Sequence, residues 1–360
     1  MADFCFIVRT YVGIDKHICV TSLRDANDRS RKTIMTRVKR VSGRNVTSDR
    51  SVRLRVAWMY YDRKMTQKEI ADTLGLARTT VIRLLEEVLH RGEVQIWIAT
   101  DSDESPGLAA DLENRLGLAE AIVVPDTRSQ EEANHSVGTA LGRFLSETMQ
   151  DGMTIGVGWG RTLNASLSSF RPARLPDTRV ISLLGGMIET GRENTTDYAW
   201  QLASRMGAEC FLYPAPLLVD SPETANVLRK ACGLDRLDRM ATSLDMAVLS
   251  VGDIGETATS LSRNLISSLD YTALVAQGAV CDVMCHALDG RGTEVDHPLN
   301  RRIMSVALSV LAETRQLVLA SGGRARAPAI LAAIKRLGCH TLITDEGAAH
   351  ALLDLTADSP

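Results

Sequence analysis

Between residues 52 and 91 the apolar side chains recur every three or four positions, the spacing of helices that bury one face. The pattern predicts three helices: one beginning at Val52, one over residues 67–74 and one over residues 78–91. Gly75 separates the last two by a tight turn. The side chains of the third helix that we expect to face inward are Val81, Leu84, Leu85 and Val88.

Two short helices joined by a tight turn are typical of the helix-turn-helix, whose second helix enters the major groove of DNA. Thr66 and Glu69 have the spacing of a capping box at the start of the first of these helices. We expect Gln67 to bind the DNA backbone and the early part of the third helix to meet bases or phosphates. The alternating run at residues 94–98 predicts a strand that would form a wing. The side chains of the third helix expected to face DNA are Arg78, Thr79, Thr80, Ile82 and Arg83.

From residue 119 onward short apolar runs alternate with helical patterns, which predicts a doubly wound parallel sheet covered by helices on both faces. A connecting helix is predicted over residues 108–116. The helices expected within this part are residues 131–149, 198–206, 327–337 and 346–353. The expected strands are residues 121–124, 154–157, 179–184, 246–251, 317–320 and 341–343.

The segment from Gly156 to Thr162 follows a predicted strand and opens a helix, which is a favourable place to bind an anion. Its glycines let the backbone approach a ligand, and Arg161 adds hydrogen-bond donors. We expect a phosphate or a cluster of sugar hydroxyls there. The candidate residues of this loop are Gly158, Trp159, Gly160, Arg161 and Thr162.

Three more glycine loops follow predicted strands, and ligands of such sheets bind at the carboxyl ends of strands. Each glycine pair has the alternative role of ending a strand. Three aspartates, Asp245, Asp282 and Asp345, could bind hydroxyl groups or instead cap helices. The residues that we add to the candidate site are Gly185, Gly186, Asp245, Gly252, Asp282, Gly323 and Arg326.

The 360 residues, of which 45% are hydrophobic and 24% charged, are enough for two or three globular domains. Residues 1–50 carry a net charge of +6, residues 51–100 of +2, and the rest of −11, so positive charge accompanies the expected DNA reader. The predicted organisation is a basic, disordered tail over 1–50, a DNA-binding domain over 51–100, a linker with the connecting helix over 101–118, and a ligand-binding domain over 119–355. A basic arm that touches DNA is the alternative for the tail.

No apolar run approaches the roughly 20 residues of a membrane helix, and the N-terminus has no secretory pattern, so we expect a cytoplasmic protein with no membrane contact. The seven cysteines have no disulfide spacing. Cys281, Cys285 and His286 form the one cluster that hints at a metal. Buried free thiols are the favoured interpretation, and we expect neither a metal nor a cofactor.

Taken together, these motifs resemble the SorC family of sugar-responsive transcriptional regulators over about residues 53–355. Its polyol-type members, including erythritol regulators, are similar in the first helix. The matching elements are Gln67-x-x-Ile70-Ala71-x-x-Leu74-Gly75, Arg78-Thr79-Thr80-Val81-x-Arg83-Leu84-Leu85, Gly158-Trp159-Gly160-Arg161-Thr162, Pro214-Ala215-Pro216, Gly278-Ala279-Val280 and Leu342-Ile343-Thr344-Asp345-Glu346.

The resemblance implies a winged or homeodomain-like DNA reader and an effector domain similar to sugar-phosphate isomerases. It also implies a homotetramer or homodimer that binds double-stranded operator DNA, with an affinity controlled by a sugar, polyol or sugar phosphate. The chain departs from the family at Ile82, where serine is usual, and at Cys281, where glycine precedes the aspartate and where we expect cysteine to crowd the loop. It also has Arg326 in place of a common lysine; arginine suits a phosphate but forms no Schiff base.

Three functions fit these features. The leading hypothesis is a non-enzymatic transcriptional regulator, expected to be a repressor of a carbohydrate or polyol catabolic operon. The second is a sugar-phosphate isomerase with an appended DNA-binding domain, which would need a positioned acid and base such as Asp282 and Asp345. The third treats the C-terminal domain as an oligomerisation scaffold alone. Ligand binding and turnover of sugar phosphates distinguish the three.

Overall fold

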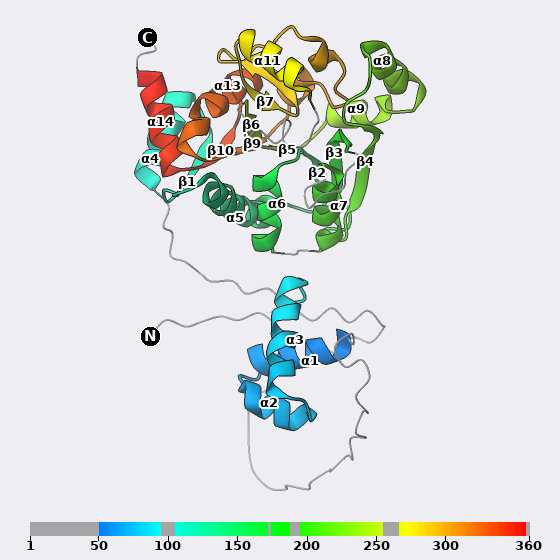
Figure 1. Cartoon of the computed structure of the whole chain (residues 1–360), viewed down its shortest axis with the longest axis vertical. Coiled ribbons are helices and arrows are strands. Elements are labelled where there is room, and N and C mark those ends of the chain that lie inside the picture. The colour runs from blue at the N-terminus through cyan, green and yellow to red at the C-terminus, as the bar shows by residue number, and fades with distance from the viewer. Residues whose placement is uncertain (1–49, 95–104, 172–173, 188–194, 255–265, 358–360) are drawn as a thin grey trace. The chain divides into compact units, whose positions relative to one another are not determined.

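The computed structural model describes residues 50–94, 105–171, 174–187, 195–254 and 266–357. The chain divides into two compact units, residues 1–99 and residues 100–360 (Figure 1), and each is considered by itself. The expected basic tail and most of the predicted wing strand lie outside the described residues.

Three helices make up the described part of the first unit: α1 (Arg50–Tyr61), α2 (Gln67–Leu74) and α3 (Arg78–His90). The side chain of Thr66 accepts the Glu69 N–H, and the Glu69 carboxylate accepts the Thr66 N–H, so the predicted capping box is present. Gly75 ends α2 with φ of 66°, in the left-handed region that favours glycine. The predicted boundaries of α2 are confirmed.

The core of the first unit is small and comes from one face of each helix. Val81, Leu84, Leu85 and Val88 are all buried, as the spacing predicts. They pack with side chains of α1 and α2, chiefly Val56, Met59 and Ile70.

A buried ion pair joins α1 to the chain that follows α3. The guanidinium of Arg53 is 3% exposed and donates from Nε and Nη2 to the two carboxylate oxygens of Glu93, at 3.0 and 2.8 Å. Hydrogen bonds from Arg53 are the main reason that the pKa of Glu93 lies below its usual value. The pair holds the first turn of α1 against the segment that follows α3.

The second unit is built on a seven-stranded sheet in which all neighbouring strands are parallel, as predicted. The strand order is β1-β10-β9-β5-β2-β3-β4. Its central strands β5 and β9 are apolar and buried along their whole length because helices cover both faces. The strands are β1 (Glu120–Val124), β2 (Thr154–Val157), β3 (Arg179–Gly186), β4 (Glu209–Pro216), β5 (Met246–Leu249), β9 (Leu317–Ala320) and β10 (Thr341–Asp345).

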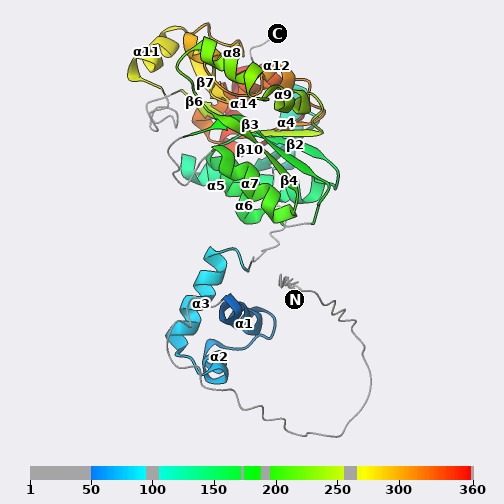
Figure 2. The same ribbon diagram turned by 90° about the vertical axis from the view of Figure 1, so that its right-hand side faces the viewer.

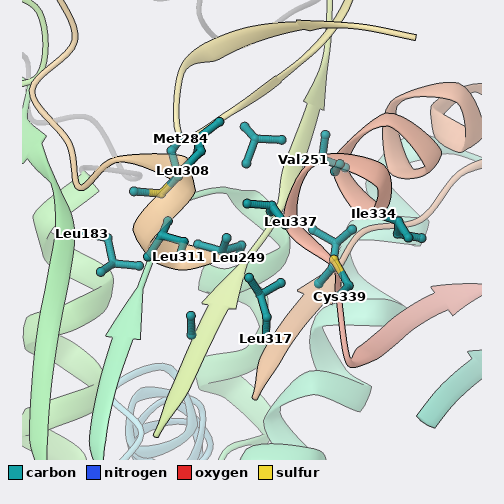
Figure 3. Close-up of a cluster of buried hydrophobic side chains, with 14 of the residues drawn as sticks. Leu183, Leu249, Val251, Met284, Leu308, Leu311, Leu317, Ile334, Leu337 and Cys339 are labelled. Atoms are coloured by element: carbon teal, nitrogen blue, oxygen red, sulfur yellow. The ribbon is translucent and has the colours of Figure 1, made fainter. Parts of the chain in front are cut away.

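Helices lie on both sides of this sheet (Figures 1 and 2). One face carries α5 (Gln130–Thr148), α6 (Arg161–Ser169) and α7 (Thr195–Met206), and these three helices share a core with the sheet. The other face is covered by a larger core (Figure 3), where Leu249 and Leu317 of the sheet gather with Leu308 and Leu311. The remaining helices are α4 (Pro106–Leu116), α8 (Pro222–Ala231), α9 (Asp235–Ala241), α11 (Ser268–Ala276), α12 (Leu308–Leu311), α13 (Ala327–Leu337) and α14 (Glu346–Ala357), with 3-10 turns η1 (Pro298–Arg301) and η2 (Arg324–Arg326).

The predicted strand over residues 246–251 is in fact two strands. β5 ends at Leu249, and β6 (Val251–Asp253) leaves for a separate antiparallel sheet with β7 (Ala279–Val283) and β8 (His286–Asp289). Strands β4, β7 and β8 were not predicted from the sequence. Prolines interrupt β4, and β7 alternates buried with half-buried positions in only five residues, so neither has the continuous apolar run of the central strands.

Two glycines let α5 and α6 approach closely. A Cβ on Gly138 would lie 2.6 Å from both the Thr162 carbonyl oxygen and the Ala165 Cβ, and Gly142 is equally crowded by Ser166 and Ser169 of α6. Hydrogen bonding adds to this contact, because Ser169 Oγ donates to the Thr139 carbonyl at 2.8 Å. The position of α6 is therefore set by the surface of α5.

Among the described residues, none of the helices has both the length and the apolar character that crossing a membrane requires.

Candidate functional site

The sheet changes its direction of winding between β2 and β5, which are neighbours. After β2 the chain adds strands towards β4, whereas after β5 it adds strands towards β10. The loops at the carboxyl ends of two such strands diverge and leave a crevice, where ligands of α/β sheets bind. A pocket lies there and encloses about 540 Å³ between the atoms, part of it open to solvent. It is lined by Asn134, Trp159, Gly160, Arg161, Thr162, Ser250, Val251, Gly252, Asp253, Asp282 and Arg326.

One wall of this polar pocket is the amino end of α6. Gly160 is the N-cap with φ of 137°, a backbone conformation that favours glycine, and no side chain caps the helix. The first backbone N–H groups of a helix have no partner within it, and they attract negative charge. Arg161 is exposed and Thr162 is buried. The arrangement provides donors for an anion or for hydroxyl oxygens.

Asn134 of α5 connects the floor of the pocket. Its side-chain oxygen accepts hydrogen bonds from Gln130 Nε2 at 3.2 Å, from Thr162 Oγ1 at 3.3 Å and from Arg326 Nη1 at 3.1 Å. Because Asn134 is 4% exposed, these contacts replace water in holding its carbonyl group. Three elements, α5, α6 and η2, thus fix one another through a single amide.

Arg326 is the buried cation of the pocket. It is 7% exposed, and its Nε donates to Oδ1 of Asp253 at 3.2 Å. Burial lowers the pKa of Arg326, the Asp253 carboxylate opposes that shift, and the nearby Arg161 adds to it. The positive charge of Arg326 is therefore partly compensated by the Asp253 carboxylate. Arg161, in contrast, is exposed to solvent.

Asp282 is the most perturbed acid of the site. It lies on β7 opposite Gly252, and burial raises its pKa to about 6, an effect that Asp253 increases and that Arg326 opposes. A carboxyl group of this kind exchanges its proton near neutral pH and can donate or accept a hydrogen bond.

Of the twelve effector-site residues proposed from the sequence, the structure brings seven into this pocket: Trp159, Gly160, Arg161, Thr162, Gly252, Asp282 and Arg326. Gly158 continues β2, because its N–H donates to Val248. Gly323 is near the pocket, but its N–H donates to the Asp345 carboxylate at 3.0 Å and is already used. Asp345 itself also accepts from Thr127 and Ala348, so its role is to hold loops and the start of α14.

Gly185 and Gly186 are not a loop after β3 but its last two residues. The Gly185 N–H donates to Met304, and the Gly186 carbonyl accepts from Leu217. A Cβ on Gly185 would lie 2.5 Å from the Ala215 carbonyl oxygen. These glycines permit close packing against β4 and contribute no lining to the pocket.

The prediction that Asp245 belongs to the ligand site is wrong, because this residue lies at the opposite edge of the sheet. It precedes β5, so it lies at the amino ends of the strands, away from the pocket. Its carboxylate accepts the Thr154 N–H at 2.9 Å and lies 3.3 Å from Arg315 Nη1. Asp245 has a structural role there.

The expectation that Cys281 crowds the loop is also wrong. Cys281 is part of β7, and its side chain is buried in the core, so burial raises the pKa of its thiol. The neighbouring His286 points to other partners, Ser305 Oγ at 2.9 Å and Glu294 at 3.3 Å. Within the described ranges no group of three His, Cys, Asp or Glu side chains is arranged to hold a metal ion.

Four residues that line the pocket were not predicted from the sequence: Asn134, Ser250, Val251 and Asp253. Asn134 lies near the start of α5 and far in the sequence from any glycine loop, so no local pattern marks it. Asp253 directly follows Gly252 at the end of β6. Because Gly252 was already a candidate, the position of Asp253 after β5 could have indicated it as a site residue.

On the first unit, the candidate DNA-facing residues differ in their exposure. Arg78, Thr79 and Arg83 are exposed, while Thr80 and Ile82 are half-buried. Gln67 does not stand alone, because its side-chain oxygen accepts hydrogen bonds from Arg78. The N-cap of α3 is Ala77, which provides no side-chain hydrogen bond to the first turn.

Comparison with known proteins identifies relatives that are all transcriptional regulators. Residues 103–354 match the family model described as "Putative sugar-binding domain". The chain is 30% identical over 326 residues to the transcriptional regulator LsrR of an Enterobacter species, covering 88% of this chain and 96% of that protein. It is 28% identical to the erythritol catabolism regulatory protein EryD of Brucella abortus, covering 85% and 97%.

A solved structure extends the likeness to the fold. The full-length sorbitol operon regulator SorC of Klebsiella pneumoniae is 26% identical, with a TM-score of 0.63 over 84% of this chain and 98% of that one. These relatives are transcriptional regulators and not enzymes. The chain therefore belongs to the SorC family of transcriptional regulators, with a sugar-binding domain over most of its length.

Proposed function

We propose that this protein is a repressor of a sugar or polyol catabolic operon, and that a small hydroxylated or phosphorylated effector controls its affinity for operator DNA. The observation that supports this most is the pocket at the switch point between β2 and β5, where a helix N-terminus, two arginines and two aspartates converge. Two relatives agree with this proposal, since one is an erythritol catabolism regulatory protein and another a sorbitol operon regulator.

The polar pocket suits a ligand with both an anionic or oxygen-rich end and neighbouring hydroxyls. Arg161 and the amino end of α6 provide donors for phosphate or hydroxyl oxygens. Asp253 and Asp282 provide acceptors for hydroxyl protons, and the buried Asn134 holds Thr162 and Arg326 in place. A sugar, a polyol or a sugar phosphate satisfies both sets.

The first unit is proposed as a winged or homeodomain-like helix-turn-helix domain over residues 51–100. In this arrangement the early residues of α3 enter the major groove, and Arg78, Thr79, Thr80 and Arg83 meet base edges or phosphates. Ile82, half-buried beside them, suits a thymine methyl group. Residues 101–118 then link this domain to the effector domain over 119–355, which resembles sugar-phosphate isomerases.

Control of DNA affinity requires that the effector distinguish two states of the protein, and we propose a dimer or tetramer whose geometry differs between them. By linkage, effector and operator then change each other's affinity by the same factor. Palindromic operators commonly match two-fold symmetric proteins, so a selected operator with two half-sites would support a dimeric unit.

Binding measurements test the proposal. An operator is selected from a random duplex library, and its affinity is measured by fluorescence anisotropy at fixed salt while polyols, sugars and their phosphates are added. At least one should shift the affinity, and Arg161→Ala should remove that shift without changing effector-free DNA binding. Arg83→Ala should weaken operator binding and reduce its salt dependence. A dose–response unaltered by Arg161→Ala would remove the site assignment.

A further inference from the structure

A second hollow lies beside the polar pocket, and its lining is almost entirely hydrocarbon. It encloses about 490 Å³ between the atoms, part of it open to solvent. Leu218, Ile254, Leu274, Ala287 and Ile303 are among its walls. Several of them pack in a separate small cluster of buried side chains around Leu274 and Ala287.

The two hollows share a wall. Asp282 lines both of them, and among the described lining residues of the apolar hollow it is the only carboxylate. A second link comes from the tryptophan of the glycine-rich loop. Trp159 lines the polar pocket, and its side chain hydrogen-bonds to the thiol of Cys285, which lines the apolar hollow. Side chains of the two hollows therefore contact each other at this boundary.

A ligand made only of hydroxylated carbons would leave the apolar hollow unused. Water gains little there because the walls offer few hydrogen-bonding groups, whereas a hydrocarbon group of a ligand is transferred out of water when it enters. Asp282 suits this boundary, since burial keeps its pKa near 6 and a protonated carboxyl group tolerates an apolar neighbour better than a carboxylate does.

We propose that the effector is amphiphilic: its hydroxylated or anionic end occupies the polar pocket, and a short hydrocarbon substituent passes Asp282 into the apolar hollow. The proposal rests on the proposed function, which assigns the polar pocket to the effector, and it narrows the chemical class of that effector. The shared lining residue Asp282 and the Trp159–Cys285 hydrogen bond, which place the two hollows side by side, carry it.

Two ligand series with the same tails test it on the full chain by isothermal titration calorimetry. One series is methyl, butyl and hexyl phosphate, and the other is methyl, butyl and hexyl β-D-glucoside. In at least one series the affinity should rise about two- to fourfold for each added methylene until the hollow is full. Affinity that is independent of tail length in both series would overturn the proposal, as would the absence of binding by all six compounds.

Variants that fill the hollow locate the tail. Ala287→Leu and Leu218→Trp add volume to two different walls, so a folding defect in one leaves the other to decide. Each should abolish the dependence on tail length and leave the affinity for the methyl compound within about twofold. Val227→Trp is the matched control, since Val227 is 61% exposed on α8 and lines neither hollow. A tail-length dependence that survives both filling variants would place the tail elsewhere and refute the proposal.

Arg161→Ala separates this inference from the proposed function. If the methyl compounds bind and lose affinity in Arg161→Ala, yet tails have no effect, the effector site stands and the amphiphilic effector is refuted. If Arg161→Ala changes the affinity of none of the compounds that bind, the assignment of the polar pocket fails, and this inference fails with it.

Discussion

The side-chain oxygen of Gln67, at the start of α2, accepts hydrogen bonds from Nε and Nη2 of Arg78, at the start of α3, over 3.4 and 3.3 Å. Both contacts use one edge of the guanidinium, so Nη1 and the second Nη2 hydrogen stay available. Two such donors match the O6 and N7 acceptors of guanine in the major groove. We therefore propose that Gln67 is a positioning residue for Arg78, where the sequence alone had suggested direct contact with the DNA backbone.

The first prediction follows from this pair. Arg78→Ala should cost about 1–3 kcal/mol in operator affinity and relax the preference for guanine at one position. Gln67→Ala should cost less, roughly 0.5–1.5 kcal/mol, because it removes only the positioning. The measurement is anisotropy of a labelled operator selected from a random library. The double variant should bind like Arg78→Ala alone, and additive losses would show that Gln67 contacts DNA independently.

The buried Arg53–Glu93 pair predicts how the first unit responds to acid. Since Arg53 lowers the pKa of Glu93, the carboxylate stabilises the folded unit above its unfolded pKa of 4.5, and that stabilisation is lost as pH falls through the lower folded value. Arg53→Met should destabilise helices α1 and α3 by about 3 kcal/mol at pH 7, because it leaves Glu93 without its main partner.

Hydrogen exchange of peptides from residues 50–94, corrected for the intrinsic pH dependence of exchange, checks this in the full chain. Arg55→Met is the control, since Arg55 is exposed on the same helix. Equal protection of these peptides in the two variants at pH 7 would contradict the assigned role of the pair.

The raised pKa of Asp282 leads us to expect a pH dependence of stability that is opposite in sign to that of the Arg53–Glu93 pair. Burial raises its pKa to about 6, from 3.8 in the unfolded chain, so the folded state holds a proton that the unfolded state releases. The stability of the second unit should therefore fall as pH rises from about 4 to 6. Asp282→Asn should remove this dependence and be more stable above pH 7 by roughly 2–3 kcal/mol.

Urea unfolding of the two proteins at pH 4.5 and pH 7.5, monitored by circular dichroism, measures the difference. The gap between variant and wild type should open between these two pH values. A gap that is equal at both would assign the effect of the substitution to something other than the charge of Asp282.

The contact of α5 with α6 predicts a large effect of one methyl group. Gly138→Ala places a Cβ against the Thr162 carbonyl and Ala165, so α6 must shift, and we expect a loss of about 1–3 kcal/mol in stability together with weaker ligand binding. Gly107→Ala is the matched control, because Gly107 is also helical but has nothing within 4 Å of the added Cβ. That variant should be unchanged or about 0.5–1 kcal/mol more stable. Thermal unfolding compares the two, and a Gly138→Ala protein as stable as Gly107→Ala would contradict the packing.

The features that could be read from the sequence are those recorded in local spacing. The capping box at Thr66, the end of α2 at Gly75 and the central strands are examples, because each depends on residues within a few positions of one another. The loop from Trp159 to Thr162 belongs to this group, since a strand, glycines and a helix start follow directly along the chain. Its lining of the pocket follows from the parallel sheet.

What could not be read depends on contacts between distant residues. Asn134 enters the pocket only because α5 packs against α6, and the pairing of Arg326 with Asp253 joins residues from η2 and β6. Asp245 shows the reverse error: an aspartate beside a strand was assigned to the site, although it precedes the strand and so lies at the opposite edge. Which end of a strand a residue occupies decides its role in a parallel sheet, and because the predicted strand already began at residue 246, the sequence was enough to exclude Asp245.

The pairing of β1 with β10 has a consequence for how the protein is made. Glu120 pairs with Thr341, so the first strand of the sheet to leave the ribosome waits for the last one before it has a neighbour. Contacts so distant in sequence form late, whereas the three helices before residue 94 need only each other. A nascent chain therefore completes its α1–α3 unit before β1 gains its neighbour, and a chain that ends before Thr341 keeps those helices but leaves β1 unpaired.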